Sequence, residues 1–123
     1  MVYEPRIFVE VRHQLQLDKQ FPFWEPYYVR VISRRAIRDF VERHPESASS
    51  LQHWANATES ADWQSTVGVR NTFNSADFVG EFTVFNVGGN KYRIIAFIHY
   101  RQGAVYIKYI LTHKEYSKGD WKQ

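Results

Sequence analysis

Cysteine is absent from this chain of 123 residues, and its absence excludes several kinds of chemistry. Without cysteine there is no disulfide bond, no cysteine-ligated zinc site or iron–sulfur cluster, and no thiol nucleophile. Long hydrophobic runs are absent as well, since the longest, residues 94–98, is far shorter than the roughly 20 residues that span a bilayer. The first residues also lack a basic segment followed by an apolar one, which is the pattern of a secretion signal. We therefore expect a cytoplasmic protein without membrane contact.

Motifs for metals and cofactors are missing too. His44 and His53 have no second ligand at the spacing of a metal site, and no Gly-x-Ser-x-Gly nucleophile motif occurs. Gly88-Gly89 is too short for a nucleotide-binding loop and is typical of a hairpin turn. The sequence predicts neither a metal site nor a cofactor.

The chain is rich in the residues that build a core. It is 44% hydrophobic and 17% aromatic, which excludes a disordered chain, and its length suits one domain. Residues 1–28 differ from the rest because they hold three of the four prolines. We therefore divide the chain into an N-terminal extension, residues 1–28, and a domain, residues 29–123.

Hydrophobic periodicity predicts the elements of that domain. A β-branched segment at residues 28–32 indicates a strand, and apolar residues at helical spacing indicate two helices, one ending before Pro45 and one around residues 51–58. Ser33 is the expected cap of the first helix, and Ser47 or Ser49 that of the second. Residues 66–73 favour a short helix and residues 74–77 a turn, and strands follow at residues 82–87, 91–100 and 104–112. The order predicts an α+β fold, with two N-terminal helices packed on a small antiparallel sheet that ends in a C-terminal meander.

Strand alternation predicts that the meander has two different faces. Tyr92 and every second residue to Tyr100 form an apolar face, and Lys91, Arg93, Ile95, Phe97 and His99 form the other. On the last strand Val105, Ile107, Tyr109 and Leu111 are expected to lie opposite Ala104, Tyr106, Lys108, Ile110 and Thr112. Cations interleaved with aromatic residues on an open sheet hold phosphates and stack bases. The alternative is a half-exposed sheet face without a ligand.

Residues after the last strand are candidates for proton transfer. His113, Lys114 and Tyr116 combine a group that titrates near neutrality with a cation and a phenol. Cleavage of RNA by its own 2′-hydroxyl needs no metal, only a base, a cation for the phosphorane and an acid for the leaving oxygen. The alternative is that His113 merely caps the strand end.

Charge is unevenly distributed along the chain. Basic residues exceed acidic ones in residues 29–43 and 91–123, whereas acidic residues are in excess in residues 44–90. Such asymmetry indicates a polyanionic partner, although ordinary solvated charge is the alternative. The candidate RNA-binding cations are Arg34, Arg35, Arg38, Lys108 and Lys114.

Two blocks of the sequence stand out: Val84-Phe85-Asn86-Val87-Gly88-Gly89-Asn90-Lys91-Tyr92-Arg93-Ile94-Ile95 and Thr112-His113-Lys114-Glu115-Tyr116. Both resemble segments of the HigB toxins of bacterial type II toxin–antitoxin systems. Weaker matches occur at residues 30–36, 61–63 and 75–79, so the resemblance covers about residues 29–120. Two features depart from the family: Leu111 stands where a glycine is common, and residues 1–28 have no counterpart, as in an added arm or a start codon placed too far upstream.

The resemblance implies a fold, an activity and partners. It implies the RelE/ParE-like fold and an mRNA interferase, a metal-independent endoribonuclease that acts on mRNA on the ribosome and leaves 2′,3′-cyclic phosphate and 5′-hydroxyl ends. It also implies a HigA-like helix-turn-helix antitoxin, through which alone the toxin would meet operator DNA. By position, Arg93 resembles the arginine that binds the scissile phosphate, with Lys91 beside it, and His113 and Tyr116 resemble residues that transfer protons or stack on a base.

Two other functions remain open at this point. The same superfamily includes ParE-like toxins that inhibit DNA gyrase without cutting RNA, and a basic sheet face alone suits a non-catalytic RNA-binding module. The combination of Lys91, Arg93 and His113 favours RNA cleavage.

Overall fold

Residues 30–32 and 34–122 are described by the computed structural model, so the expected extension and the expected cap Ser33 lie outside the described residues. Strand β1 (Arg30–Ile32) precedes helix α2 (Arg34–Arg43), the 3-10 helix η1 (Pro45–Ser47) and helix α3 (Ala48–Glu59). Helix α4 (Thr66–Thr72) and strand β2 (Asp77–Val79) follow, and then strands β3 (Phe82–Val87), β4 (Tyr92–His99) and β5 (Ala104–Thr112). Helix α5 (His113–Lys118) and the 3-10 helix η2 (Asp120–Lys122) come last. The α+β class is confirmed, and helices α2 and α3 with the meander of β3, β4 and β5 match part of the expected arrangement.

The sheet differs from the expected one in two ways. Its strand order is β1-β5-β4-β3-β2, and β1 runs parallel to β5, so the sheet is mixed rather than antiparallel. Strand β2 pairs with β3 at the other edge; the expected turn at residues 74–77 comes before it and overlaps it only at Asp77. A three-residue strand is too short to show alternation, and periodicity says nothing about which distant strand will be a partner. The sequence therefore missed a fifth strand and the direction of the first.

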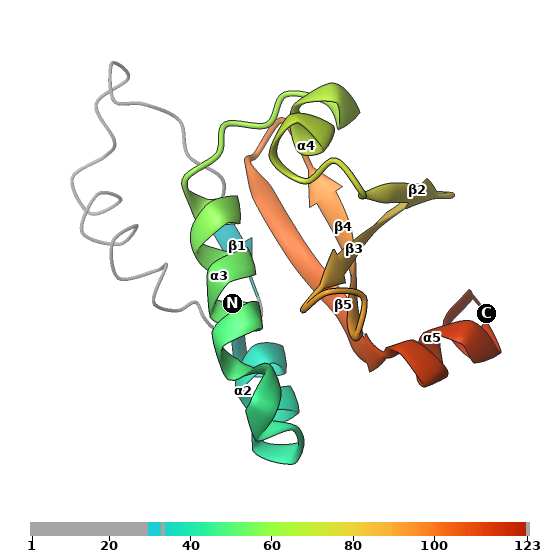
Figure 1. Cartoon of the computed structure of the whole chain (residues 1–123). Helices are drawn as coiled ribbons and strands as arrows, with labels where there is room; N and C mark the ends of the chain where they lie inside the picture. The colour runs from blue at the N-terminus through green and yellow to red at the C-terminus, as the bar shows by residue number, and fades with distance from the viewer. Residues whose placement is uncertain (1–29, 33, 123) are drawn as a thin grey trace.

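Helices α2 and α3 lie on the same side of the sheet and bury one of its faces (Figure 1). Phe40 and Trp54 come from these helices, and Phe85 and Ile94 meet them from the sheet; all four are buried. The Trp54 and Phe85 rings meet edge to face with centroids 5.3 Å apart, a favoured geometry for aromatic pairs. This apolar layer holds the sheet rigid behind its other face.

A β-bulge on β5 corrects the expected alternation. Ile95 pairs with Tyr109 and Ala96 with Ile107, which leaves Lys108 as the extra residue. The extra residue reverses which side chains of β5 point to each face of the sheet. Ile110 therefore lies in the core under the helices, and Tyr109 lies beside Ile95 on the face that α2 and α3 do not cover, which we call the open face. The sequence predicted that Tyr109 lies on the same face as Ile107. That prediction was wrong because one residue added to a strand moves the side chains that follow it to the opposite face.

The chain beyond β5 covers part of the open face. Trp121 is buried there against Val84 and Ile95, and its Nε1 donates a hydrogen bond to the Tyr116 carbonyl oxygen at 3.1 Å. The ring of Tyr116 stacks on the Trp121 ring with centroids 5.2 Å apart. Trp121 therefore anchors α5 to the sheet.

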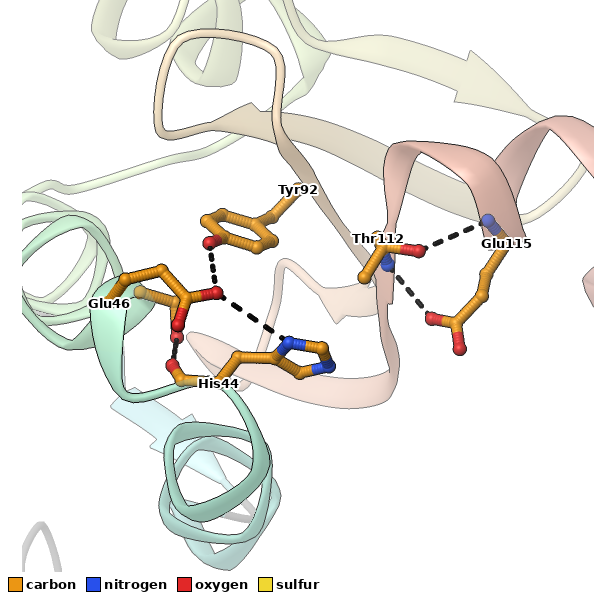
Figure 2. A network of polar contacts seen from close by, with 6 residues as sticks. His44, Glu46, Tyr92, Thr112 and Glu115 are labelled. Carbon is orange, nitrogen blue, oxygen red and sulfur yellow. Dashed lines mark hydrogen bonds and ion pairs between the residues drawn. The ribbon is translucent and has the colours of Figure 1, made fainter.

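Two polar contacts position the ends of β4 and β5 (Figure 2). The Tyr92 hydroxyl donates to Glu46 Oε2 at 3.0 Å, and His44 Nδ1 lies 3.6 Å from the same oxygen. A backbone hydrogen bond, together with the Tyr92 hydroxyl, lowers the pKa of Glu46 from its usual value, and burial raises the pKa of Tyr92. This network ties η1 to the first residue of β4.

The second contact is a capping box at the start of α5 (Figure 2). Thr112 Oγ1 accepts a hydrogen bond from the Glu115 backbone N–H at 3.2 Å, and Glu115 Oε1 accepts one from the Thr112 N–H at 2.9 Å. The two bonds satisfy donors that a helix start leaves unpaired. They stabilise the junction at which β5 ends and α5 begins.

The substitution Thr112→Ala is expected to lower the free energy of unfolding by about 1 kcal/mol, because it removes the side-chain acceptor of the cap. Urea denaturation followed by circular dichroism measures the change. Thr66→Ala, at the exposed first residue of α4, is the matched control and should have a smaller effect. Equal losses in the two variants would show that the capping box adds no stability.

Candidate active site

Arg93 is a buried cation on the open face of the sheet. Its side chain is 7% exposed, although it lies on the face that α2 and α3 do not cover. Its Nη1 donates to the carbonyl oxygens of Asn90 (3.0 Å) and Tyr92 (3.2 Å), and its Nη2 donates to Asn90 Oδ1 (2.7 Å). The guanidinium is thus held in one place by the hairpin that joins β3 to β4.

Asn90 accepts hydrogen bonds from Arg93 because of its position in the hairpin turn. Its φ is 80°, and among the described residues it is the only one other than glycine with a positive φ. Asparagine tolerates this conformation and still carries a side-chain acceptor, which glycine lacks. The sequence marked Asn90 as a turn residue and missed its contact with Arg93. The signal was an acceptor side chain at a turn position three residues before an arginine.

His113, the first residue of α5, lies next to Arg93. His113 Nδ1 lies 3.2 Å from Arg93 Nη2, and the His113 backbone N–H donates to the Lys91 carbonyl oxygen at 2.9 Å. Arginine nitrogens only donate, so Nδ1 is the acceptor and the neutral ring carries its proton on Nε2. The His113 side chain is exposed, so its ring is open to a ligand.

Tyr116 completes the group from the first turns of α5. The Arg93 guanidinium carbon lies 5.0 Å from the centre of the Tyr116 ring, a cation–π distance. The same ring stacks on that of Trp121, a residue that no sequence pattern pointed to. The structure therefore brings together Arg93, His113 and Tyr116, and adds Asn90 as a further member.

The charge of Arg93 is not neutralised within the group. Every partner given above is uncharged, and the ion pairs among the described residues involve other side chains. Burying a cation without a carboxylate is costly, and an anion at the site offsets that cost. The arrangement suits an anionic ligand such as a phosphodiester, held next to an unprotonated imidazole nitrogen.

The other candidate cations lie at different places. Lys91 and Lys114 flank the group and are exposed, Lys91 in the hairpin turn and Lys114 on α5. Arg34, Arg35 and Arg38 belong to α2, which packs on the other face of the sheet, and Arg34 pairs with Glu59 at 3.5 Å. The structure separates these three arginines from Arg93.

Lys108 lies on the open face, where its Nζ is 6.0 Å from the Phe82 ring centre and 5.9 Å from that of Tyr109. The described part of the chain contains no group of three or more His, Cys, Asp or Glu side chains that would hold a metal ion. Among these same residues, no helix is both long and apolar enough to cross a membrane.

Comparisons with known proteins identify the family of this chain. The mRNA interferase toxin HigB of Escherichia coli (strain K12) is 29% identical over 91 residues, which cover 72% of this chain and 88% of that relative. The mRNA interferase HigB of Shigella flexneri has the same identity and coverage, and that of Escherichia coli O6:H1 (strain CFT073) is 26% identical over 93 residues, covering 73% of this chain and 90% of the relative. A family model described as HigB_toxin, RelE-like toxic component of a toxin-antitoxin system, matches residues 47–119, a range that includes Asn90, Arg93, His113 and Tyr116. Because this match spans more than half of its length, the chain belongs to the HigB toxin family, the RelE-like toxic components of toxin–antitoxin systems.

Proposed function

We propose that this toxin is an endoribonuclease that cleaves mRNA and so blocks translation. The relatives named as mRNA interferases support the substrate and the activity. The observation that carries the proposal is the buried guanidinium of Arg93, whose partners in the described residues are all uncharged. A scissile phosphate supplies the anion that this site is suited to hold.

Arg93 and His113 are proposed to act on neighbouring atoms of the same nucleotide. A phosphate oxygen competes with His113 Nδ1 for the hydrogen bond of Arg93 Nη2, because the two nitrogens are only 3.2 Å apart. When the hydrogen bond passes to the phosphate, Nδ1 has a free lone pair beside the 2′-hydroxyl. Substrate binding therefore releases the base that the reaction needs.

The bonds and protons of the cleavage then balance without a metal. His113 Nδ1 takes the proton of the 2′-hydroxyl as the 2′-oxygen bonds to phosphorus, and the Arg93 charge stabilises the phosphorane. The bond from phosphorus to the 5′-oxygen breaks, and that oxygen takes a proton from Tyr116 or Lys91. The products are a 2′,3′-cyclic phosphate and a 5′-hydroxyl.

The antitoxin partner is proposed to act at the same site. A HigA-like helix-turn-helix protein is expected to place an acidic segment over Arg93 and the exposed Lys91 and Lys114, where opposite charges are complementary. Contact with operator DNA is then made by the antitoxin alone. A target on the ribosome, and hence in the cytoplasm, remains part of this proposal, as does the role of residues 1–28 as an extension to a toxin domain of residues 29–123.

The substitution His113→Ala is expected to slow RNA cleavage by about 100- to 10,000-fold, the range for loss of a general base. The His113 side chain is exposed, so the variant should fold. Cleavage of an mRNA is measured with and without ribosomes, and the ends of the products are identified. The matched control is His53→Ala, an exposed histidine on α3, which should cleave normally.

Three results would contradict the proposal. Full cleavage by His113→Ala would remove the base from the mechanism. Products with 3′-phosphate or 3′-hydroxyl ends, formed with no cyclic intermediate, would exclude attack by the 2′-hydroxyl. Inhibition of DNA gyrase without any RNA cleavage would identify the ParE-like function, and RNA binding without either effect would identify a binding module.

The substitution Asn90→Gly is expected to lower kcat by about 10- to 100-fold, because Arg93 loses an acceptor that orients it. Glycine accepts the positive φ at this position, so the free energy of unfolding should change little. Asn90→Asp keeps an acceptor but places a carboxylate against Arg93, so it should also raise KM by competing with the phosphate. The control is Asn74→Gly, in the turn before β2. An unchanged kcat in Asn90→Gly would show that Asn90 does not position Arg93.

A further inference from the structure

We propose that the open face of the sheet beyond Arg93 binds the single-stranded RNA that flanks the scissile phosphate. The stacking platform, as we name it, consists of the rings of Phe97, Tyr106 and Tyr109 with the Lys108 ammonium. The inference rests on the proposed function, since it concerns the substrate of the same site. It names residues on β4 and β5 that the chemistry of cleavage does not use.

Exposed rings are concentrated on this face. Among the described residues four large hydrophobic side chains are exposed, and three of them belong to the platform: Phe97 at 36%, Tyr106 at 38% and Tyr109 at 37%. The fourth is Val67 on α4. Single exposed apolar residues are ordinary on a protein surface, but neighbouring ones mark a binding site.

The register of the strands places the platform in line with the active site. Arg93 pairs with Leu111, Ile95 with Tyr109, and Phe97 with Tyr106, and these three pairs lie on the same face. Each pair is two residues further along β4, a step of about 7 Å. Tyr109 is therefore one step from Arg93 and Phe97 two. Ile95, between them on β4, is buried against Trp121, whereas Leu111 on β5 is only partly buried. A strand of RNA with its phosphate at Arg93 would therefore reach these rings along β5, past Leu111 to Tyr109.

The β-bulge supplies the positive charge of the platform. It leaves Lys108 out of the pairing of β4 with β5, and the Lys108 Nζ reaches back over the rings of Tyr109 and Phe82. A cation beside exposed rings offers a phosphate contact and a base-stacking surface together. An apolar peptide would use the rings alone, so the pairing of ring and cation favours a nucleic acid strand.

RNA strands of two lengths test this inference. Both carry a 2′-deoxynucleotide at the scissile position so that neither is cut; the short strand spans only that site, and the long strand adds nucleotides on either side. Fluorescence anisotropy measures their affinities for the full chain and for Tyr109→Leu, which keeps an apolar side chain but removes the ring. We expect the long strand to bind the variant roughly 5- to 100-fold more weakly than the parent, and the short strand to lose much less.

A matched control and a second variant make the result specific. Val67→Ala removes the exposed apolar residue outside the platform and should bind both strands as the parent does. Lys108→Met keeps the length of the side chain without its charge, and it should weaken binding of the long strand and reduce the dependence of that binding on salt. Thermal unfolding confirms that each variant is folded.

The outcomes separate this inference from the proposed function. If the parent cuts RNA but the platform variants keep the parent's ratio of long-strand to short-strand affinity, the platform is wrong and the nuclease stands. If the parent cuts no RNA but the variants lose that ratio, the face binds RNA and the nuclease is wrong. Loss of antitoxin binding in the variants without loss of the long strand would assign the face to the antitoxin and overturn the inference.

Discussion

The buried guanidinium of Arg93 is the interaction on which the candidate site depends. Its four hydrogen bonds reach the β3–β4 turn and the first residue of β4 on one side and His113, at the start of α5, on the other. Burying this cation has a desolvation cost, and hydrogen bonds to neutral partners offset only part of that cost. The site therefore suits an anionic ligand, and this property connects the fold to the proposed chemistry on a phosphodiester.

The rest of the molecule keeps this group in place. The apolar layer under α2 and α3 fixes the sheet from behind, and the Glu46–Tyr92 contact fixes the residue next to Arg93. On the open face, Trp121 and the capping box hold α5 so that the ring of Tyr116 covers the guanidinium. None of these supports needs a metal or a disulfide, in agreement with a chain that has no cysteine.

The candidate site was partly predictable from the sequence. The family blocks pointed to Arg93, His113 and Tyr116, and the structure brings these residues together. They did not point to Asn90 or Trp121, because a turn residue and a tryptophan near the end of a chain have commoner structural roles. Arg34, Arg35 and Arg38 were grouped with the site by charge alone, and charge in a sequence does not say on which side of a sheet a helix packs.

Local patterns settled what local forces control. The lengths and types of most elements, the hairpin at Gly88-Gly89-Asn90 and the apolar face of β4 follow from side-chain periodicity and turn chemistry, which act over a few residues. Only the tertiary structure decided the parallel pairing of β1 with β5, the bulge at Lys108 and the contact of Arg93 with His113. These features join segments far apart in the chain, and their geometry depends on strand register, which is set by the packing of the whole core.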